Sequence, residues 1–286
     1  MDQLQEKFVM VTGATSGIGQ VTARELARRG ATVVIVGRNL AKCQRTVEDI
    51  QRATGNPRVR YLVADLALMR EVRDLAREFL TEYPRLDILV NNAGAIFPQR
   101  TVTKEGLEQT WALNHLSYFL LTHQLMPALL AAPTARVINV SSDAHFAARG
   151  VHIEDPMFER RRYSAFAAYS QSKLANVMFT AALARRLRNT TITANALHPG
   201  AVATNFGIGH GGIVSALFKL ARPFMLTPEQ GAQTTIYLAT SDAVQHTSGA
   251  YFDRCKTKPP SPAARDVNAQ EQLWALSEQH IMRVSL

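Results

Sequence analysis

Short apolar runs alternate with longer amphipathic stretches along most of the chain. Apolar runs at 8–11, 32–36, 59–64, 86–90, 137–140 and 191–197 predict buried strands, and 250–252 predicts a final one. The stretches between them, such as 68–83 and a long helical region at about 104–130, predict helices. Strands buried on both faces are near-continuously apolar, and strand–helix alternation is typical of a parallel sheet covered by helices. The pattern therefore predicts an α/β fold with a doubly wound parallel sheet.

Glycine-rich or polar motifs follow the predicted strands. They stand at 12–19, 37–39, 65–66, 91–94, 141–142 and 198–200. A doubly wound sheet binds its ligands at the carboxyl ends of its strands, where these motifs would gather. The sequence thus predicts a binding site along one edge of the sheet.

The first motif contains Gly13, Gly17 and Gly19 between a strand and an amphipathic helix. Glycines let the backbone approach a pyrophosphate closely, and a helix N-terminus offers free N–H groups to it. We expect a dinucleotide here. The alternative is a tight strand-to-helix turn that binds nothing.

The second strand ends at Gly37 and Arg38, where NAD-binding folds of this kind carry an acidic residue for the ribose. A guanidinium pairs well with a 2′-phosphate. We therefore expect NADP(H) rather than NAD(H). A solvent-facing arginine at the start of a loop is the alternative.

Tyr169 precedes Lys173 by one helical turn, so both lie on one helix face. An ammonium near the hydroxyl favours the phenolate and would lower the pKa of the tyrosine. Tyr169 could then exchange a proton with a carbonyl or an alcohol. Alone, this spacing is also common on solvated helix faces.

Composition narrows the picture further. The 286 residues, 47% hydrophobic, include only two cysteines, Cys43 and Cys255, which predicts neither a disulfide framework nor a zinc site. We expect no metal, no signal peptide, no transmembrane segment and a cytoplasmic location. The formal charge of +9 is scattered, so we expect no nucleic-acid partner, although a positive field would attract an anionic cofactor.

The stretch 205–226 is apolar and rich in glycine, and it interrupts the strand–helix rhythm. We predict a substrate lid there. Two ordinary packing helices, or membrane-surface contact through Lys219 and Arg222, are alternatives. We find no repeat and no interdomain linker, so residues 1–286 are expected to form one domain.

Together these motifs resemble those of the short-chain dehydrogenase/reductase family over nearly the whole chain. The resemblance implies a single Rossmann-type domain with about seven parallel strands, and a homodimer or homotetramer. In that family the dimer interface commonly involves the helix that here carries Asn114 and the helix that carries Tyr169. The matching pieces are Thr12-Gly13, Gly17-Ile18-Gly19, Asn91-Asn92-Ala93-Gly94, Asn114, Ser142, Tyr169, Lys173 and Pro199-Gly200.

The resemblance also implies catalytic roles. Tyr169 exchanges the proton with the substrate oxygen, and Ser142 hydrogen-bonds that oxygen, with Ser141 as the competing candidate. Lys173 lowers the pKa of the tyrosine and holds the nicotinamide ribose, and Asn114 supports a proton-relay water. The reaction is hydride transfer between the cofactor and a carbonyl or alcohol carbon.

For the cofactor, the resemblance places Asp65 and Leu66 beside the adenine, Asn91 on the adenosine side and Thr204 at the nicotinamide amide. His198 could be a further ligand, although a structural imidazole is the simpler interpretation. The complete expected set is Gly13, Thr15, Ser16, Gly17, Ile18, Gly19, Arg38, Asp65, Leu66, Asn91, Ala93, Gly94, Tyr169, Lys173, Pro199, Gly200, Val202 and Thr204.

Within the family the chain looks closest to the retinol-dehydrogenase-like branch. Leu113-Asn114-His115-Leu116, Ser172-Lys173-Leu174-Ala175-Asn176 and Thr227-Pro228-Glu229-Gln230-Gly231-Ala232 carry this likeness. The N-terminal anchor common in that branch has no counterpart here, so we expect a reductase acting on lipophilic aldehydes or ketones. An NAD(H)-dependent alcohol or steroid dehydrogenase, or a non-catalytic NADP(H) sensor, are the alternatives.

Overall fold

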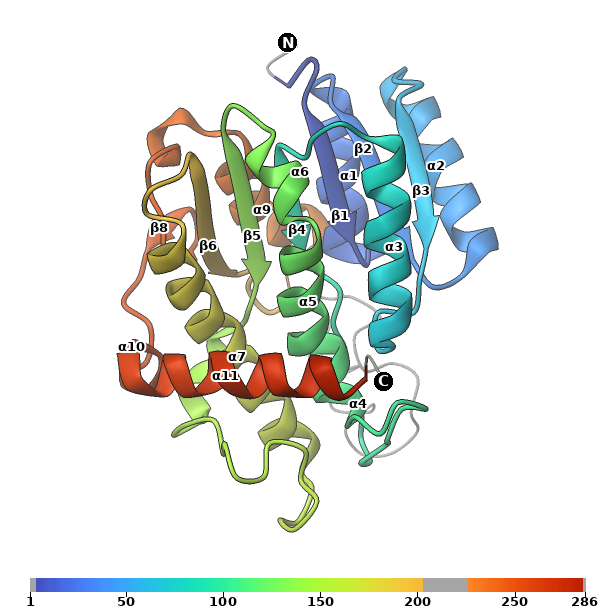
Figure 1. Ribbon diagram of the computed structural model, residues 1–286. Coiled ribbons are helices and arrows are strands. Elements are labelled where there is room, and N and C mark those ends of the chain that lie inside the picture. The colour runs from blue at the N-terminus through green and yellow to red at the C-terminus, as the bar shows by residue number, and fades with distance from the viewer. Residues whose placement is uncertain (1–3, 203–225, 285–286) are drawn as a thin grey trace.

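The fold is built on one mostly parallel sheet, as the apolar runs predicted (Figure 1). The computed structural model describes residues 4–202 and 226–284. In these ranges the sheet has eight strands in the order β3-β2-β1-β4-β5-β6-β7-β8, all parallel except the β7–β8 pair. The strands are β1 (Phe8–Thr12), β2 (Thr32–Gly37), β3 (Val59–Val63), β4 (Ile88–Asn91), β5 (Ala135–Val140), β6 (Ile192–His198), β7 (Tyr251–Asp253) and β8 (Lys256–Thr257).

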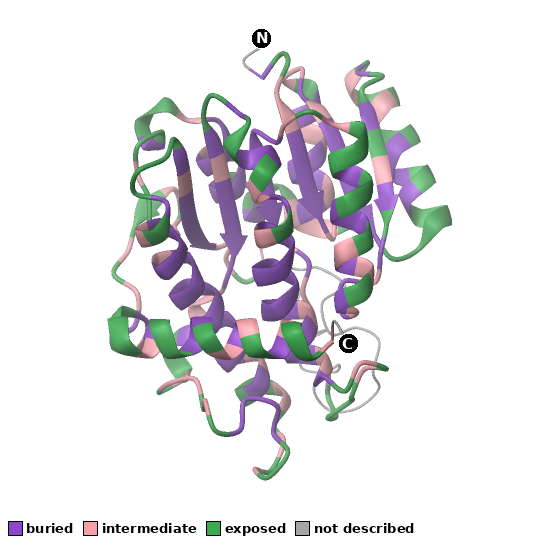
Figure 2. Cartoon of the chain, in the orientation of Figure 1, coloured by how far each residue is buried: buried purple, intermediate pink, exposed green. Residues whose placement is uncertain are grey.

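Helices cover both faces of this sheet, and each layer has its own apolar core. On one face lie α1 (Gly17–Arg28), α2 (Leu40–Thr54) and α9 (Pro228–Thr240). On the other lie α3 (Met69–Glu82), α5 (Ser117–Gln124), α7 (Ala165–Arg186) and α11 (Val267–Arg283). The inner strands are buried throughout most of their length, the edge strands β3 and β8 are partly or fully exposed, and the outer helices are buried on one side only (Figure 2). The shorter elements are α4 (Gln109–Trp111), η1 (Ala112–Leu116), α6 (Met126–Leu130), η2 (Asp143–Ala147), η4 (Asp242–Val244) and α10 (Pro262–Arg265).

The strand order places a crevice at one point of the sheet. From β1 the chain builds outward through β2 and β3, and it then returns to add β4 on the other side of β1. A doubly wound sheet opens for ligands where its order reverses in this way, beyond the carboxyl ends of the strands. The motifs after β1 and β4 therefore lie on either side of that crevice.

The helical region predicted at about 104–130 is broken into several pieces, which corrects the sequence prediction. A turn precedes α4, a π-helical stretch η1 follows it, and α5 ends at Gln124 before α6 begins at Met126 and Pro127. The π-helical turn carries Asn114, and such turns are frequent at functional sites.

The C-terminal helix α11 lies across α7 and α5 (Figure 1). Its Trp274 ring is 5.0 Å from the Phe119 ring and 5.9 Å from the Phe179 ring, measured between centroids, and the Arg186 guanidinium lies 3.7 Å from the Trp274 ring centroid. This helix therefore covers part of the surface through which the resemblance predicted dimer contacts. The homodimer or homotetramer stays a prediction.

The predicted lid at 205–226 and the predicted cofactor ligand Thr204 fall almost entirely outside the described ranges; only Leu226 lies within them. Within the described part of the chain, no helix is both long and apolar enough to cross a membrane.

Candidate active site

The glycine-rich turn after β1 packs directly against the turn after β4. Gly13 has a φ of +64°, and a Cβ on it would lie 2.8 Å from the Ala93 Cα. A Cβ on Gly19 would lie 2.5 Å from the Asn92 side-chain nitrogen and 2.6 Å from the Gly13 carbonyl oxygen. Both contacts are too close for any side chain, so these glycines allow the two turns to meet.

Asn92 and Thr12 join these turns, and the sequence analysis assigned neither a role. The Asn92 side-chain amide donates to the Thr12 carbonyl at 2.8 Å. The Thr12 hydroxyl accepts from the backbone N–H groups of Asn92 at 2.8 Å and Ala93 at 3.1 Å. In the sequence, the second asparagine of Asn91-Asn92-Ala93-Gly94 was the feature from which this contact could have been predicted. In the structure, that asparagine bonds to the glycine-rich turn.

Helix α1 begins in this turn with its first N–H groups uncapped. Ser16 occupies the N-cap position with extended backbone, yet its side chain makes no capping hydrogen bond. Thr15 and Ile18 flank it and are partly exposed. A helix N-terminus of this kind attracts a phosphate.

Arg38 lies beyond β2, on the same edge of the sheet. Its side chain is exposed, and it makes no hydrogen bond or ion pair with any residue that the structure describes. The neighbouring Asn39 caps α2 by accepting from the Lys42 N–H at 2.9 Å. The guanidinium is therefore available to an anionic ligand.

The turn after β3 holds the predicted adenine contacts. The Asp65 carboxylate accepts from the Ala67 N–H at 3.0 Å, and the Asp65 N–H donates to Glu71 at 2.6 Å. Leu66 is buried. These bonds fix the shape of the turn that would lie beside an adenine.

The side chain of Asn91 packs in the core, and the predicted contact of this residue with the adenosine side of the cofactor stays a prediction. Its side chain is fully buried, and its amide donates to Asn139 at 2.9 Å and to Thr122 at 3.1 Å. The amide therefore ties β4 to β5 and α5 inside the core. A cofactor would therefore contact the backbone of Asn91 rather than its side chain.

Asn114 lies beside the loop that follows β4 and is bonded to it. Its side chain accepts from the Ala95 N–H and donates to the Ala95 carbonyl, both at 2.9 Å. Its own carbonyl accepts from the Asn176 amide at 2.8 Å. The structure thus shows Asn114 bridging a loop and two helices, and its part in a proton relay stays a prediction.

Gly94 keeps this corner open. A Cβ on it would lie 3.2 Å from the Asn114 side-chain oxygen and 3.5 Å from the Lys173 ammonium nitrogen. The space beside the ammonium therefore depends on glycine at this position.

The two serines after β5 have different partners. The buried Ser141 hydroxyl donates to the Lys173 carbonyl at 2.7 Å, which engages it in holding α7. The Ser142 hydroxyl accepts from the Ala144 N–H at 3.1 Å and hydrogen-bonds to the side chain of Tyr169. This geometry favours Ser142 over Ser141 as the serine that meets the substrate.

Lys173 is buried and Tyr169 is half-buried, and this corrects the predicted effect of one on the other. The Lys173 ammonium donates to the Val140 carbonyl at 2.9 Å and lies 5.7 Å from the centroid of the Tyr169 ring. Burial lowers the pKa of Lys173 to about 7. Burial also raises the pKa of Tyr169 to about 12, against the opposing hydrogen bond from Ser142. The expected lowering of the tyrosine pKa by Lys173 is therefore not found, because burial opposes the charged form of both groups.

His198, at the end of β6, has a structural partner. Its Nδ1 accepts from the Asp143 N–H at 3.2 Å. Burial lowers the pKa of His198, although the nearby Asp143 acts against that shift. This supports the structural interpretation of the imidazole.

The chain then turns at Pro199 and Gly200, where Gly200 has a φ of +87°. A Cβ on Gly200 would clash with the Leu226 side chain, and one on Gly231 would clash with Val202. These contacts pack the turn after β6 against the start of α9.

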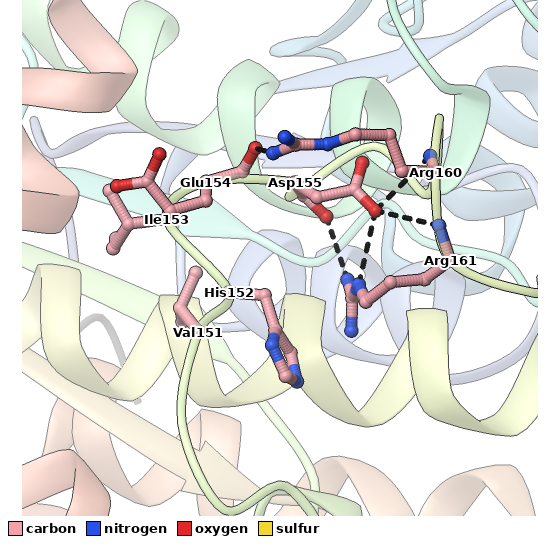
Figure 3. Close-up of a pocket in the computed structure, with 7 residues that line it drawn as sticks. All are labelled: Val151, His152, Ile153, Glu154, Asp155, Arg160 and Arg161. Atoms are coloured by element: carbon pink, nitrogen blue, oxygen red, sulfur yellow. Dashed lines mark hydrogen bonds and ion pairs between the residues drawn. The ribbon is translucent and has the colours of Figure 1, made fainter.

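The predicted catalytic residues do not line the cavity in Figure 3. That cavity, of about 500 Å³, lies in the segment between η2 and α7 and is lined by Val151, His152, Ile153, Glu154, Asp155, Arg160 and Arg161. Asp155 accepts from the backbone N–H groups of Glu159, Arg160 and Arg161 and from the Arg161 side chain. These bonds close the segment on itself. Across the described residues, no group of three or more His, Cys, Asp or Glu side chains could hold a metal ion.

A dinucleotide fits the residues of the crevice. The uncapped first turn of α1 suits its phosphates, and exposed Arg38 suits a further anionic group. Lys173 has one protein acceptor in the described structure, so other N–H bonds of its ammonium can reach ribose hydroxyls. Beside them, Tyr169 and Ser142 share a hydrogen bond. Fold and site together define an oxidoreductase that binds a nicotinamide nucleotide.

Comparison with known proteins agrees with this class. The family model for short chain dehydrogenases matches residues 7–154 and 156–209. Human retinol dehydrogenase 13 is 42% identical over 277 residues, covering 95% of this chain and 83% of the relative. The chain belongs to the short-chain dehydrogenase family, and its predicted likeness to the retinol dehydrogenases is confirmed.

Solved structures show the same fold. A crystal structure of an uncharacterised protein from Mycobacterium paratuberculosis has a TM-score of 0.77 and 35% identity, over 97% of this chain and 94% of that one. A short chain dehydrogenase from Shigella flexneri, solved with NADP, has a TM-score of 0.68 and 25% identity, over 89% and 99%. The predicted α/β fold is thereby confirmed.

Proposed function

We propose that this protein is an NADP(H)-dependent reductase of lipophilic aldehydes or ketones, with a retinal-like compound as the model substrate. One observation carries the proposal: the Ser142 hydroxyl hydrogen-bonds to the Tyr169 side chain, one helical turn from the Lys173 ammonium that donates to the Val140 carbonyl. The pKa of Tyr169, raised to about 12, lies far above 7. At neutral pH the tyrosine therefore carries its proton. A protonated acid next to a hydrogen-bond donor suits carbonyl reduction, in which the substrate oxygen gains a proton.

The residues divide the work as follows. The nucleotide supplies the hydride when bound. The Ser142 hydroxyl orients the carbonyl oxygen and stabilises the negative charge that develops there. Tyr169 gives its hydroxyl proton to that oxygen. Lys173, anchored on the Val140 carbonyl, holds ribose hydroxyls and keeps the nucleotide in register with the tyrosine.

The preference for NADP(H) rests on Arg38. Its exposed guanidinium has no protein partner among the described residues, and it follows β2 where an acidic residue would bind an NAD ribose. The Shigella neighbour is described with NADP, which supports the same nucleotide here. We expect Arg38→Asp to shift the ratio of kcat/KM values towards NADH. An unchanged ratio would reject the role of Arg38.

The substrate class rests on the relatives. A 42% identical human protein carries the name retinol dehydrogenase, which points to a long apolar alcohol or aldehyde. The apolar, glycine-rich composition of 205–226 also fits an apolar substrate.

The test is turnover of a carbonyl panel with NADPH and, separately, NADH, followed by loss of the reduced-cofactor absorbance. The panel contains all-trans-retinal, other bulky apolar aldehydes and ketones, and small sugars. We expect NADPH-selective turnover of the apolar members. Selective turnover with NADH would favour the alternative NAD(H)-dependent dehydrogenase, and NADPH binding without any turnover would favour a sensor.

A further inference from the structure

A cluster of polar side chains braces the backbone directly behind Ser142. The Asp143 carboxylate accepts from the Lys258 ammonium at 2.9 and 3.0 Å and from the Tyr251 hydroxyl at 2.9 Å. Lys258 follows β8, more than a hundred residues later in the chain. The residue next to the serine is thus fixed by the far edge of the sheet.

Lys258 also bridges two carboxylates. Its ammonium donates to Asp253 at 3.1 Å, so one positive charge lies between Asp143 and Asp253. The side chains are about one-quarter to one-third exposed, so this is a partly buried ion pair rather than a surface one. Hydrogen bonds from Lys258 and Tyr251 lower the pKa of the Asp143 carboxyl against the opposing effect of burial.

The backbone of Asp143 is held as well. Its N–H donates to His198 Nδ1 at 3.2 Å, so a neutral His198 carries its proton on Nε2. That Nε2 lies 3.7 Å from the Asp143 carboxylate. Backbone and side chain of Asp143 are therefore both fixed.

A second pair of hydrogen bonds, through His145, connects Ser261 to the Ser142 carbonyl. His145 Nδ1 donates to the Ser142 carbonyl at 2.8 Å, while His145 Nε2 accepts from the Ser261 N–H at 3.1 Å. Both bonds fit one neutral tautomer, which burial favours by lowering the pKa of His145. The segment from Lys258 to Ser261 thus contacts Asp143 and His145, and His145 in turn bonds to the Ser142 carbonyl.

We propose that the Asp143–Lys258 ion pair is a positioning device for the catalytic serine, and this rests on the function proposed above. The Ser142 hydroxyl must accept from the Ala144 N–H while it faces Tyr169, so its direction depends on the conformation of residues 142–144. Removal of the Lys258 charge leaves two carboxylates facing each other across the site. Their repulsion moves Asp143 and the adjoining serine.

The test is steady-state kinetics of Lys258→Met, Lys258→Arg and the matched control Lys256→Met. Lys256 is an exposed lysine on β8, two residues away. We expect Lys258→Met to lower kcat about tenfold, in the range of coupling between contacting residues, with unchanged affinity for NADPH. The Arg variant should restore most of kcat, and the Lys256 control should match the wild type. Equal kcat values for the Met variants at positions 258 and 256 would overturn the proposal.

A double-mutant cycle separates positioning from a general structural role. In a Ser142→Ala background, Lys258→Met should have little further effect on kcat, because its effect passes through the serine. Independent, multiplying effects would overturn the proposal. If Lys258→Met folds poorly, Asp143→Asn replaces it. This variant weakens the contact with Lys258 without leaving two carboxylates face to face, so a smaller loss of kcat is expected, and an unchanged kcat would overturn the proposal.

Hydrogen exchange of the peptide spanning 141–147 gives a readout that needs no substrate. Its amides donate to His198, Ser142 and Leu197, so loss of the brace should speed their exchange in Lys258→Met and not in Lys256→Met. If the wild type turns over no carbonyl, the proposed function fails and this exchange decides the inference alone. Unchanged exchange would then reject it, and faster exchange would support it.

Discussion

Replacing Lys173 with methionine should make the stability of the protein less dependent on pH. The ammonium is buried, donates to the Val140 carbonyl and forms no ion pair within the described structure. Burial lowers the pKa of Lys173 from its ordinary 10.5 to about 7. Because the unfolded chain binds this proton more tightly than the folded chain, the burial of Lys173 costs stability. The cost is complete below pH 7 and disappears as the pH rises through 7 towards 10.5.

The size of the effect follows from the two pKa values. Each pKa unit corresponds to about 1.4 kcal/mol, so the cost at pH 7 is about 4 kcal/mol. Between pH 7 and pH 9 the wild type should regain about 2 kcal/mol through this one group. For a chain of 286 residues, that gain corresponds to a rise in Tm of about 3–4 °C.

The assay is thermal and urea unfolding of the wild type and Lys173→Met at pH 7 and pH 9. Histidine and cysteine titrations contribute equally to both proteins, so the difference between them isolates Lys173. We expect Lys173→Met to gain stability relative to the wild type at pH 7, and this advantage to shrink at pH 9. Lys256→Met, which removes an exposed lysine, should show no such change. An advantage of the same size at both pH values would refute the lowered pKa and the reasoning from burial.

Three further predictions test other parts of the account. Ser142→Ala should lower kcat about 10²-fold, because it removes a donor to the developing oxyanion. Ser141→Ala should mainly lower the free energy of unfolding, by about 1 kcal/mol in urea titrations, because it removes the hydrogen bond to the Lys173 carbonyl. Gly19→Ala should weaken NADPH binding in fluorescence titrations, because the new Cβ would lie 2.5 Å from the Asn92 amide nitrogen. The control is Gly150→Ala, whose Cβ would meet open space. Equal NADPH binding by the two variants would count against that contact. Trp274→Ala should cost about 3–5 kcal/mol in urea unfolding, since the indole fills an aromatic cluster between α11, α5 and α7; a loss below about 1 kcal/mol would show that α11 is not tightly docked.

Much of the fold could be predicted from the apolar runs. Strands β1, β2, β4, β5 and β6 are buried on both faces over most of their length, so their sequences are mostly apolar and stand out from the amphipathic helices. Strand β3, at the edge of the sheet, exposes Arg60 and Val63. The region 104–130 was harder, because one apolar stretch contains a π-helical turn and Pro127 that divide it. Hydrophobic pattern does not record such breaks in backbone hydrogen bonding.

The site could be predicted as a set of residues but not as a network. Spacing and family likeness predicted Tyr169, Ser142 and Lys173, and the structure brings them together, while their catalytic roles stay predictions. The pKa values followed from burial, which depends on the surrounding layers and is invisible in the spacing of Tyr169 and Lys173. The Asp143–Lys258 pair joins residues 115 positions apart, so it could not be predicted without the order of the strands in the sheet.

Asn91 shows what a motif alone leaves open, and its predicted place on the adenosine side of the cofactor stays a prediction. It belongs to a motif beside the cofactor site, and its side chain nevertheless serves the core by bonding to Asn139 and Thr122. A motif at a strand end identifies the right place, while alternation along the strand decides which side chain faces the crevice.

The most direct test of the central claim is NADPH-dependent reduction of all-trans-retinal by the wild type and by Tyr169→Phe, with NADPH binding measured on both. The account predicts turnover by the wild type, a loss of at least 10²-fold in kcat for Tyr169→Phe, and similar NADPH affinity for the two proteins. Near-normal turnover by Tyr169→Phe would contradict the assignment of Tyr169 as the proton donor.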